Sequence, residues 1–249
     1  MRRDLPVYRR EVVSTAEGRA TTVHVLRVPR AEYTARVVVL DPAQPLIDWC
    51  AENGVAEAVI GGFYVRADGT PLGELRVDGR ALPSVPFDSP WNRVRACVHA
   101  DRGEVVLRSR LELAADPGGD LLQAGPMLAR GGVCLIDPGA DDEGFSAGAR
   151  QFDSDITAGR HPRAALGLSA TEMIAAVCDG RAEAEAGLDL TELARAMIDL
   201  GAVDAINLDG GGSASLVVGG ELVNAPHEEH GMPLPGGRSI STALRFAAR

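Results

Sequence analysis

The stretch "INLDGGGSASLVV" (residues 206–218) decides how the chain folds around its centre, because it sets three consecutive glycines between two apolar runs. The runs predict one strand at 204–208 and another at 214–218, joined by the glycine turn. Glycine adopts positive φ freely and has no side chain, so such a turn can bring backbone N–H groups close to an anion. A plain hairpin turn uses glycine equally well. The sequence therefore leaves open an anion-binding turn and an ordinary one.

The residues after the glycines exclude two common glycine motifs. A phosphate-binding P-loop needs Lys and then a helix, whereas Ser213 leads into the strand-like "ASLVV". The nucleophile elbow Gly-x-Ser-x-Gly needs glycine where Ser215 stands. The turn belongs to neither class.

Composition limits the possible partners. The chain has 249 residues, of which 45% are hydrophobic, so it can bury a core of its own. Its formal net charge is -10, which disfavours nucleic acid and anionic membranes but still permits a small anionic ligand. No stretch reaches the roughly 18 apolar residues of a membrane helix, and the start lacks the apolar core of a secretory signal. We expect a soluble cytoplasmic protein.

The 4 cysteines are dispersed and form no Cys-x-x-Cys pair. Disulfides or a metal site remain possible, but the mostly apolar neighbours favour buried, reduced thiols. The residues are Cys50, Cys97, Cys134 and Cys178.

Strand-like runs outnumber helical ones. Helices are predicted at 45–54, which begins with proline and ends with glycine, and within "LDLTELARAMIDLGA" (188–202). We expect a mixed α/β (α+β) fold, with one domain over residues 1–249 and a central mixed sheet flanked by helices. Residues 1–54 would supply N-terminal strands and a helix, and residues 55–246 the core. Strands are predicted at 22–28, 36–40, 57–60, 94–99, 104–107, 164–168, 172–178, 204–208, 214–218, 221–223 and 240–246.

A long segment without periodicity, residues 137–160, is rich in Gly, Asp and Ser. Loops of this length inside a compact domain are usually lids or linkers. We expect a lid over the site. Asp153 and Asp155 could bind a hard cation there, although solvated lid residues fit the same pattern.

Polar clusters stand at the ends of several predicted strands. Asp179 and Arg181 follow one strand in "VCDGR", while His161 and Arg163 precede another in "HPRAALGL". Glycine turns adjoin further apolar runs in "AVIGGFY" and "QAGPML". Because loops at strand ends commonly carry sites, we expect the segments of Gly61, Gly125, Asp179 and Asp209 to meet at one crevice.

These motifs together give the chain a family resemblance. "GGFYVRADGTPLGELRVDGR", "QAGPML", "HPRAALGL", "VCDGRAEAEAGLDLTELARAMIDLGAVDAINLDGGGS" and "GGRSISTALRF" occur in the order seen in the phosphodiester glycosidase family, over residues 55–246. The sequence resembles that family, whose bacterial members differ in substrate. It departs at Ile60, where relatives commonly have Asn.

The resemblance implies a hydrolase that cleaves a small glycosyl phosphodiester into a sugar and a phosphate monoester. Such a reaction needs a carboxylate at the anomeric carbon and cations or N–H groups around the phosphate, and we expect no cofactor and no metal. The candidate catalytic residues are Asp209, Asp179, Glu74 and His161. The candidate binding residues are Arg163, Arg181, Arg238, Gly210, Gly211, Gly212, Ser213, Asn207, Gly61, Gly62 and Gly125.

Alternatives stay open for several of these features. Asp209 could only shape the glycine turn, and His161 could hydrogen-bond its own loop instead of protonating a leaving oxygen. The segment "HEEH" (227–230) suggests a metal site, yet it lacks the i, i+4 histidine spacing of zinc-protease helices and reads better as a charged loop. At the level of function, a non-catalytic binder of phosphosugars or envelope glycans, or a phosphodiesterase that breaks the P–O bond, are the alternatives.

Overall fold

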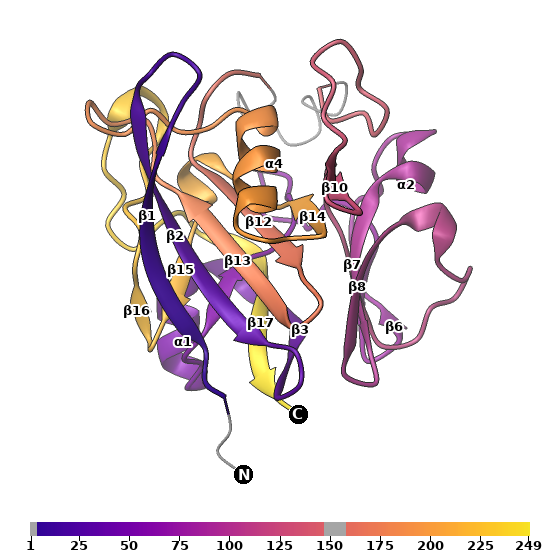
Figure 1. Ribbon diagram of the computed structural model, residues 1–249. Helices are drawn as coiled ribbons and strands as arrows, with labels where there is room; N and C mark the ends of the chain where they lie inside the picture. Colours follow the sequence, from indigo (N-terminus) through magenta and orange to yellow (C-terminus); the bar gives the residue numbers. More distant parts are fainter. Residues whose placement is uncertain (1–3, 147–157) are drawn as a thin grey trace.

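Three antiparallel sheets form the framework of the computed structural model, which describes residues 4–146 and 158–249 (Figure 1). The first sheet has 7 strands and holds both the N-terminal hairpin and the strand that leads into the glycine turn. Its strands, in spatial order, are β1 (Val7–Ser14), β2 (Ala20–Pro29), β13 (Glu172–Cys178), β12 (Arg163–Leu168), β14 (Asp204–Asn207), β10 (Met127–Arg130) and β11 (Val133–Cys134).

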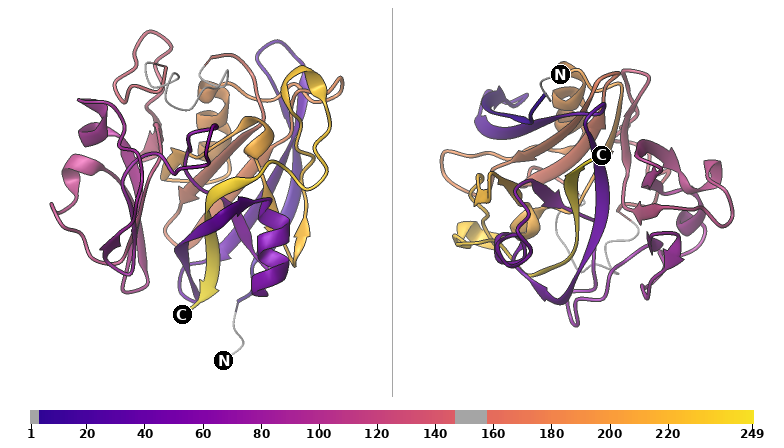
Figure 2. Two further views of the ribbon diagram at one scale, coloured as in Figure 1. Left: turned by 180° about the vertical axis from the view of Figure 1, so that it is seen from behind. Right: turned by 90° about the horizontal axis from the view of Figure 1, so that it is seen from below.

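The other two sheets have 5 strands each, and the third stands to one side of the others in both views of Figure 2. The second sheet runs β16 (Glu221–Leu222), β15 (Leu216–Val218), β4 (Ala58–Ile60), β17 (Ile240–Ala248) and β3 (Tyr33–Gln44). The third runs β6 (Arg80–Ala81), β5 (Leu75–Val77), β9 (Asp120–Gln123), β7 (Ala96–Asp101) and β8 (Glu104–Ser109). The α-helices of the described chain are α1 (Leu46–Asn53), α2 (Trp91–Val94) and α4 (Leu190–Asp199).

Helix α4 covers one face of the first sheet (Figure 1). It begins at a capping box, in which the Asp189 carboxylate accepts from the Glu192 N–H at 2.8 Å and the Glu192 carboxylate accepts from the Asp189 N–H at 3.1 Å. Its Leu193 and Met197 pack with Ala165 of β12 in one apolar cluster. The opposite face of the sheet packs against the second and third sheets in a larger cluster.

The mixed α/β class expected from the sequence is confirmed, and every strand predicted from an apolar run is present within a few residues of its expected ends. The strands pair antiparallel in three sheets rather than in one mixed sheet, because short turns join many of the neighbours. All 4 cysteines are free thiols, and Cys134 is only half-buried. Within residues 4–146 and 158–249, no helix is long and apolar enough to cross a membrane.

Antiparallel pairing brings the expected site segments to one edge of the first sheet. Arg163 pairs with Cys178, Ala165 with Asn207, and Met127 with Ile206. The residues after β13, before β12, after β14 and before β10 therefore lie side by side. The second sheet approaches the same edge, since the Asp209 N–H donates to the Gly61 carbonyl at 3.0 Å.

Candidate active site

The glycine turn is built for close packing, which explains its sequence. Gly211 has φ +60, a conformation that residues with a side chain disfavour. Gly212 leaves little room for a side chain, because a Cβ there would lie 3.1 Å from both Arg238 Nη2 and Glu228 Cδ. The Gly210 N–H donates to the Asp209 carboxylate at 2.8 Å and the Gly211 N–H to the Pro162 carbonyl at 2.8 Å. Two of the N–H groups expected to bind phosphate are thus used within the protein.

Asp209 follows β14 and is a buried carboxylate with a perturbed pKa. It is 7% exposed, and burial raises its pKa to about 6. The Gly210 N–H, the Ser213 hydroxyl and the charges of Arg238 and Arg66 oppose this rise in the pKa without cancelling it. A buried acid with a raised pKa beside cations is typical of a functional site.

Tyr64, which our sequence reasoning did not select, completes the surroundings of Asp209. Its hydroxyl lies 3.2 Å from Ser213 Oγ, and both side chains are buried. Burial and the Asp209 charge raise the pKa of Tyr64, while Ser213 and Arg238 oppose the shift. The phenol therefore stays protonated and can donate a hydrogen bond. Its position within the motif "GGFYVR" was the sequence feature that could have identified Tyr64 as a site residue.

Two ion pairs lie beside Asp209. Arg238 Nε donates to Glu228 Oε1 at 2.7 Å, and its Nη2 contacts the other oxygen of the same carboxylate. Arg66 Nη1 lies 3.3 Å from Glu229 Oε1. Arg66, Glu228 and Glu229 were also missed as site residues, since the sequence does not show that the "HEEH" loop meets these arginines.

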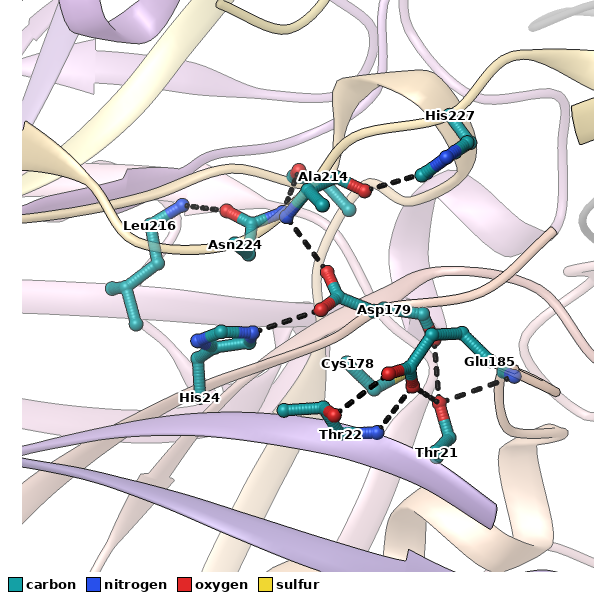
Figure 3. Close-up of polar contacts among 12 residues, drawn as sticks. Thr21, Thr22, His24, Cys178, Asp179, Glu185, Ala214, Leu216, Asn224 and His227 are labelled. Atoms are coloured by element: carbon teal, nitrogen blue, oxygen red, sulfur yellow. Dashed lines mark hydrogen bonds and ion pairs between the residues drawn. The ribbon is translucent and has the colours of Figure 1, made fainter. Parts of the chain in front are cut away.

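Asp179 lies at the same edge with a separate set of partners (Figure 3). Its Oδ2 is 2.9 Å from His24 Nε2, and its Oδ1 accepts from the Ala225 N–H at 2.8 Å. Tyr8 Oη lies 2.8 Å from His24 Nδ1, which extends the chain of contacts to β1. Both carboxylate oxygens are thus bound, and Asp179 ties the first sheet to the segment that follows β16.

Arg163 is buried on the other side of the sheet. Arg163 lies two residues before Ala165 and so shares its face of the sheet, which α4 covers. Asp179 lies two residues after Val177 and so lies on the opposite face, which packs in the larger core cluster. Arg163 Nε donates to the Leu188 carbonyl and its Nη2 to the Gly159 carbonyl, each at 3.0 Å. The structure therefore brings Arg163 to the expected edge but on the face opposite to Asp179.

The expected lid is described only in part. Residues 137–138, 140–143, 145–146 and 158–159 line a cavity of about 480 Å³ together with Arg163 and the start of α4. Residues 147–157, with Asp153 and Asp155, lie outside the described part of the chain. The lid over Asp209 stays a prediction.

Glu74 and His161 have partners other than Asp209. Glu74 directly precedes β5 of the third sheet, where Arg76 Nε donates to its carboxylate at 2.9 Å and Arg110 also binds it. Burial opposes ionisation of Glu74, but these two arginines together lower its pKa. His161 Nε2 lies 2.7 Å from the Ala158 carbonyl, and its Nδ1 lies 3.4 Å from Arg181 Nη2. These contacts match the loop-binding alternative for His161.

The remaining candidates shape the backbone around the site. The N–H groups of Gly61 and Gly62 donate to the Thr242 carbonyl at 2.9 Å and hydroxyl at 3.0 Å. Asn207 Nδ2 donates to the Gly125 carbonyl at 3.1 Å, while Asn207 Oδ1 is buried without a hydrogen-bond partner among the described residues. Gly210, Ser213 and Arg238 are binding candidates that act directly on the Asp209 carboxylate.

A buried acid beside arginines suits an enzyme that cleaves an anionic sugar conjugate. The family model described as phosphodiester glycosidase matches residues 53–247, and the chain belongs to this family. The mouse (Mus musculus) protein named N-acetylglucosamine-1-phosphodiester alpha-N-acetylglucosaminidase is 29% identical over 237 residues. That match covers 88% of this chain and 44% of the mouse protein, so the chain spans less than half of this relative's length.

Solved structures share the fold. The zebrafish N-acetylglucosamine-1-phosphodiester alpha-N-acetylglucosaminidase catalytic domain, auto-inhibited by its pro-peptide, superposes with a TM-score of 0.73 at 20% identity, covering 98% of this chain and 83% of that chain. A protein from Synechocystis superposes with a TM-score of 0.65 at 16% identity, covering 98% and 62%. The fold and family expected from the sequence are therefore confirmed.

Proposed function

We propose that this chain hydrolyses glycosyl phosphodiesters at the bond between the anomeric carbon and its oxygen. Water adds to the anomeric carbon, and the phosphate monoester leaves with the bonding electrons. The observation that carries the proposal is the buried Asp209 carboxylate, with its pKa raised to about 6, beside Arg238 and Arg66. Family membership supports the same reaction class.

Each part of the cluster has a chemical task in this reaction. A phosphate monoester is a good leaving group, so the transition state resembles an oxocarbenium ion and needs little help from a general acid. Asp209 would stabilise or attack the anomeric carbon, and its burial makes that electrostatic interaction stronger than in water. Arginine holds phosphate oxygens bidentately, which suits Arg238 for the anionic part.

The sugar is the finer part of the proposal. N-acetylglucosamine is the first sugar to test, because it stands in the name of the mouse relative. The test is a panel of sugar phosphodiesters and matching neutral aryl glycosides, assayed for released sugar. The proposal expects turnover of at least one phosphodiester and slower turnover of its neutral counterpart. Binding of the panel without any turnover would favour a non-catalytic sugar-phosphate binder instead.

The pH dependence gives a separate prediction. We expect kcat/KM for a phosphodiester to rise as pH increases through about 6, because Asp209 must be ionised and burial raises its pKa to about 6. The phosphodiester keeps its charge over this range, and an aspartate with an ordinary pKa would place the rise near ~4. The measurement is a profile of initial rates at low substrate concentration. A profile that falls through this range would contradict an ionised Asp209.

A further inference from the structure

The "HEEH" loop presents two neighbouring carboxylates, and each pairs with a different arginine beside Asp209. Glu228 binds Arg238 through both carboxylate oxygens, and Glu229 lies 3.3 Å from Arg66. Arg238 Nη2 lies 3.1 Å from the position that a Cβ would take at Gly212, in the turn that follows Asp209, and the charges of both arginines act on the pKa of Asp209. The two glutamates therefore form ion pairs with the two arginines that lie near Asp209, the candidate catalytic acid.

The charges of this cluster oppose binding of an anion as the structure stands. Arg66 and Arg238 face three carboxylates, those of Asp209, Glu228 and Glu229. Burial works against ionisation of Glu228, but the hydrogen bonds and charge of Arg238 outweigh it and lower the pKa of Glu228. Glu228 is therefore ionised at neutral pH. An incoming phosphate would meet arginines that are already neutralised.

The pairs are accessible enough for exchange. Side-chain exposure is 19% for Arg238 and 26% for Glu228, and it is 29% for Arg66 and 44% for Glu229. Both pairs stay partly open to solvent, so a ligand with better geometry can reach the arginines and replace the glutamates. The phosphate of a phosphodiester offers two unesterified oxygens, which the planar forks of the two arginines can bind.

The loop that carries the glutamates is fixed at both ends. Its start is held by the Ala225 N–H on Asp179 at 2.8 Å, and its end by the Arg238 N–H on the Gly212 carbonyl at 3.1 Å. Between these points His230 and Gly231 both have positive φ. The Glu228 N–H donates to the Met232 carbonyl at 2.8 Å, which closes the turn. The carboxylates can leave the arginines by side-chain rotation while the backbone stays in place.

We propose that Arg66 and Arg238 form a two-arginine subsite for the substrate's phosphate, and that Glu228 and Glu229 fill this subsite until the phosphate displaces them. The proposal rests on the proposed function and adds the residues that select an anionic substrate. A neutral glycoside gains nothing from displacing the glutamates, whereas a phosphodiester replaces each carboxylate contact with a phosphate contact. Glu228 and Glu229 are thus internal competitors of the phosphate.

The test measures binding of inorganic phosphate by calorimetry at neutral pH. Glu228→Gln keeps the size of the side chain and removes its charge, so we expect phosphate to bind about five- to tenfold more tightly. Glu229→Gln should tighten binding by a smaller factor, because its pair is longer and more exposed. Arg238→Gln should abolish measurable binding. Glu221→Gln, an exposed glutamate on β16, is the matched control and should leave the affinity unchanged.

Each outcome either supports or overturns the subsite. Weaker phosphate binding in Glu228→Gln would show that Glu228 supports Arg238 instead of competing, and unchanged affinity in both glutamate variants would also reject the proposal. Tm measurements on every variant separate these effects from loss of folding. If affinities change as expected but no phosphodiester is hydrolysed, the proposed function fails and the subsite stands. If hydrolysis occurs without the affinity changes, the subsite fails alone.

Discussion

Asp209→Asn is expected to lower kcat for a glycosyl phosphodiester by about a hundredfold or more. Asparagine keeps the size of the side chain and can still accept the Gly210 N–H, which donates to Asp209 Oδ1 at 2.8 Å. It removes the negative charge that would meet the developing positive charge at the anomeric carbon. The measurement is kcat and KM together with Tm. Wild-type turnover would reject a catalytic role for Asp209, and loss of folding would favour the turn-shaping role.

The pKa of Asp209 predicts the direction in which Asp209→Asn changes the stability of the fold. The pKa of Asp209 rises from 3.8 to about 6 on folding. The acid therefore favours the folded state most at low pH, and this contribution is lost as pH rises from about 4 to about 6. At pH 8 the buried charge costs stability, so Asp209→Asn should have a Tm equal to or above that of the wild type.

Asp179→Asn serves as the matched comparison at the same sheet edge. Both oxygens of Asp179 have partners, His24 Nε2 at 2.9 Å and the Ala225 N–H at 2.8 Å. An amide has only one acceptor oxygen, so its NH₂ group must face one of these donors or force His24 to change its protonation. We expect a lower Tm and a smaller loss of kcat than in Asp209→Asn. The reverse pattern would make Asp179 the stronger catalytic candidate.

Arg163→Met is expected to lower the free energy of unfolding by about 3–5 kcal/mol. The guanidinium is buried, and the substitution removes its hydrogen bonds to the carbonyl groups of Leu188 and Gly159, each 3.0 Å long. These carbonyl groups then lose a charged donor. For a chain of this size, the change corresponds to a fall in Tm of roughly 10 °C. Thermal unfolding followed by circular dichroism measures it.

Arg163→Lys and a surface control separate the two roles that Arg163 could have. Arg195→Met removes an exposed arginine from α4 and should leave Tm nearly unchanged. Lysine at 163 keeps the charge but loses the planar fork, so a role in phosphate binding would raise KM for a phosphodiester more than for a neutral glycoside. Unchanged Tm with a raised KM would contradict the stabilising role that the structure favours for Arg163.

The strands that the sequence predicted lie in recognisable apolar runs, such as those of β2, β13 and β17. Strand β1 was not predicted because "VYRREVVS" forms an exposed edge strand, whose charged residues interrupt the apolar alternation. Strands β9 and β10 were not predicted for another reason. Each has only four residues, and the two flank the "AGP" turn, so the sequence indicates a turn there and no strands.

The candidate site was predictable where one segment of the chain carries several of its residues. Asp209 and Ser213 could be found because the glycine turn lies between two clear strands. The partners from distant segments could not, because pairing of Arg66 with Glu229 spans 163 positions in the chain. His24 reads as part of a buried strand, and only the fold shows that it meets Asp179. Alternation along β12 shows that Arg163 and Ala165 share a face of the sheet. Only the fold shows that this is the face that α4 covers.

Hydrolysis of an N-acetylglucosamine phosphodiester in ¹⁸O-labelled water tests the central claim most directly. If Asp209 acts at the anomeric carbon, the bond between that carbon and its oxygen breaks, and mass spectrometry will find the label in the released sugar. The phosphate monoester will then carry none. Label in the phosphate would show that the P–O bond breaks, and would contradict the assignment of this site as a glycosidase.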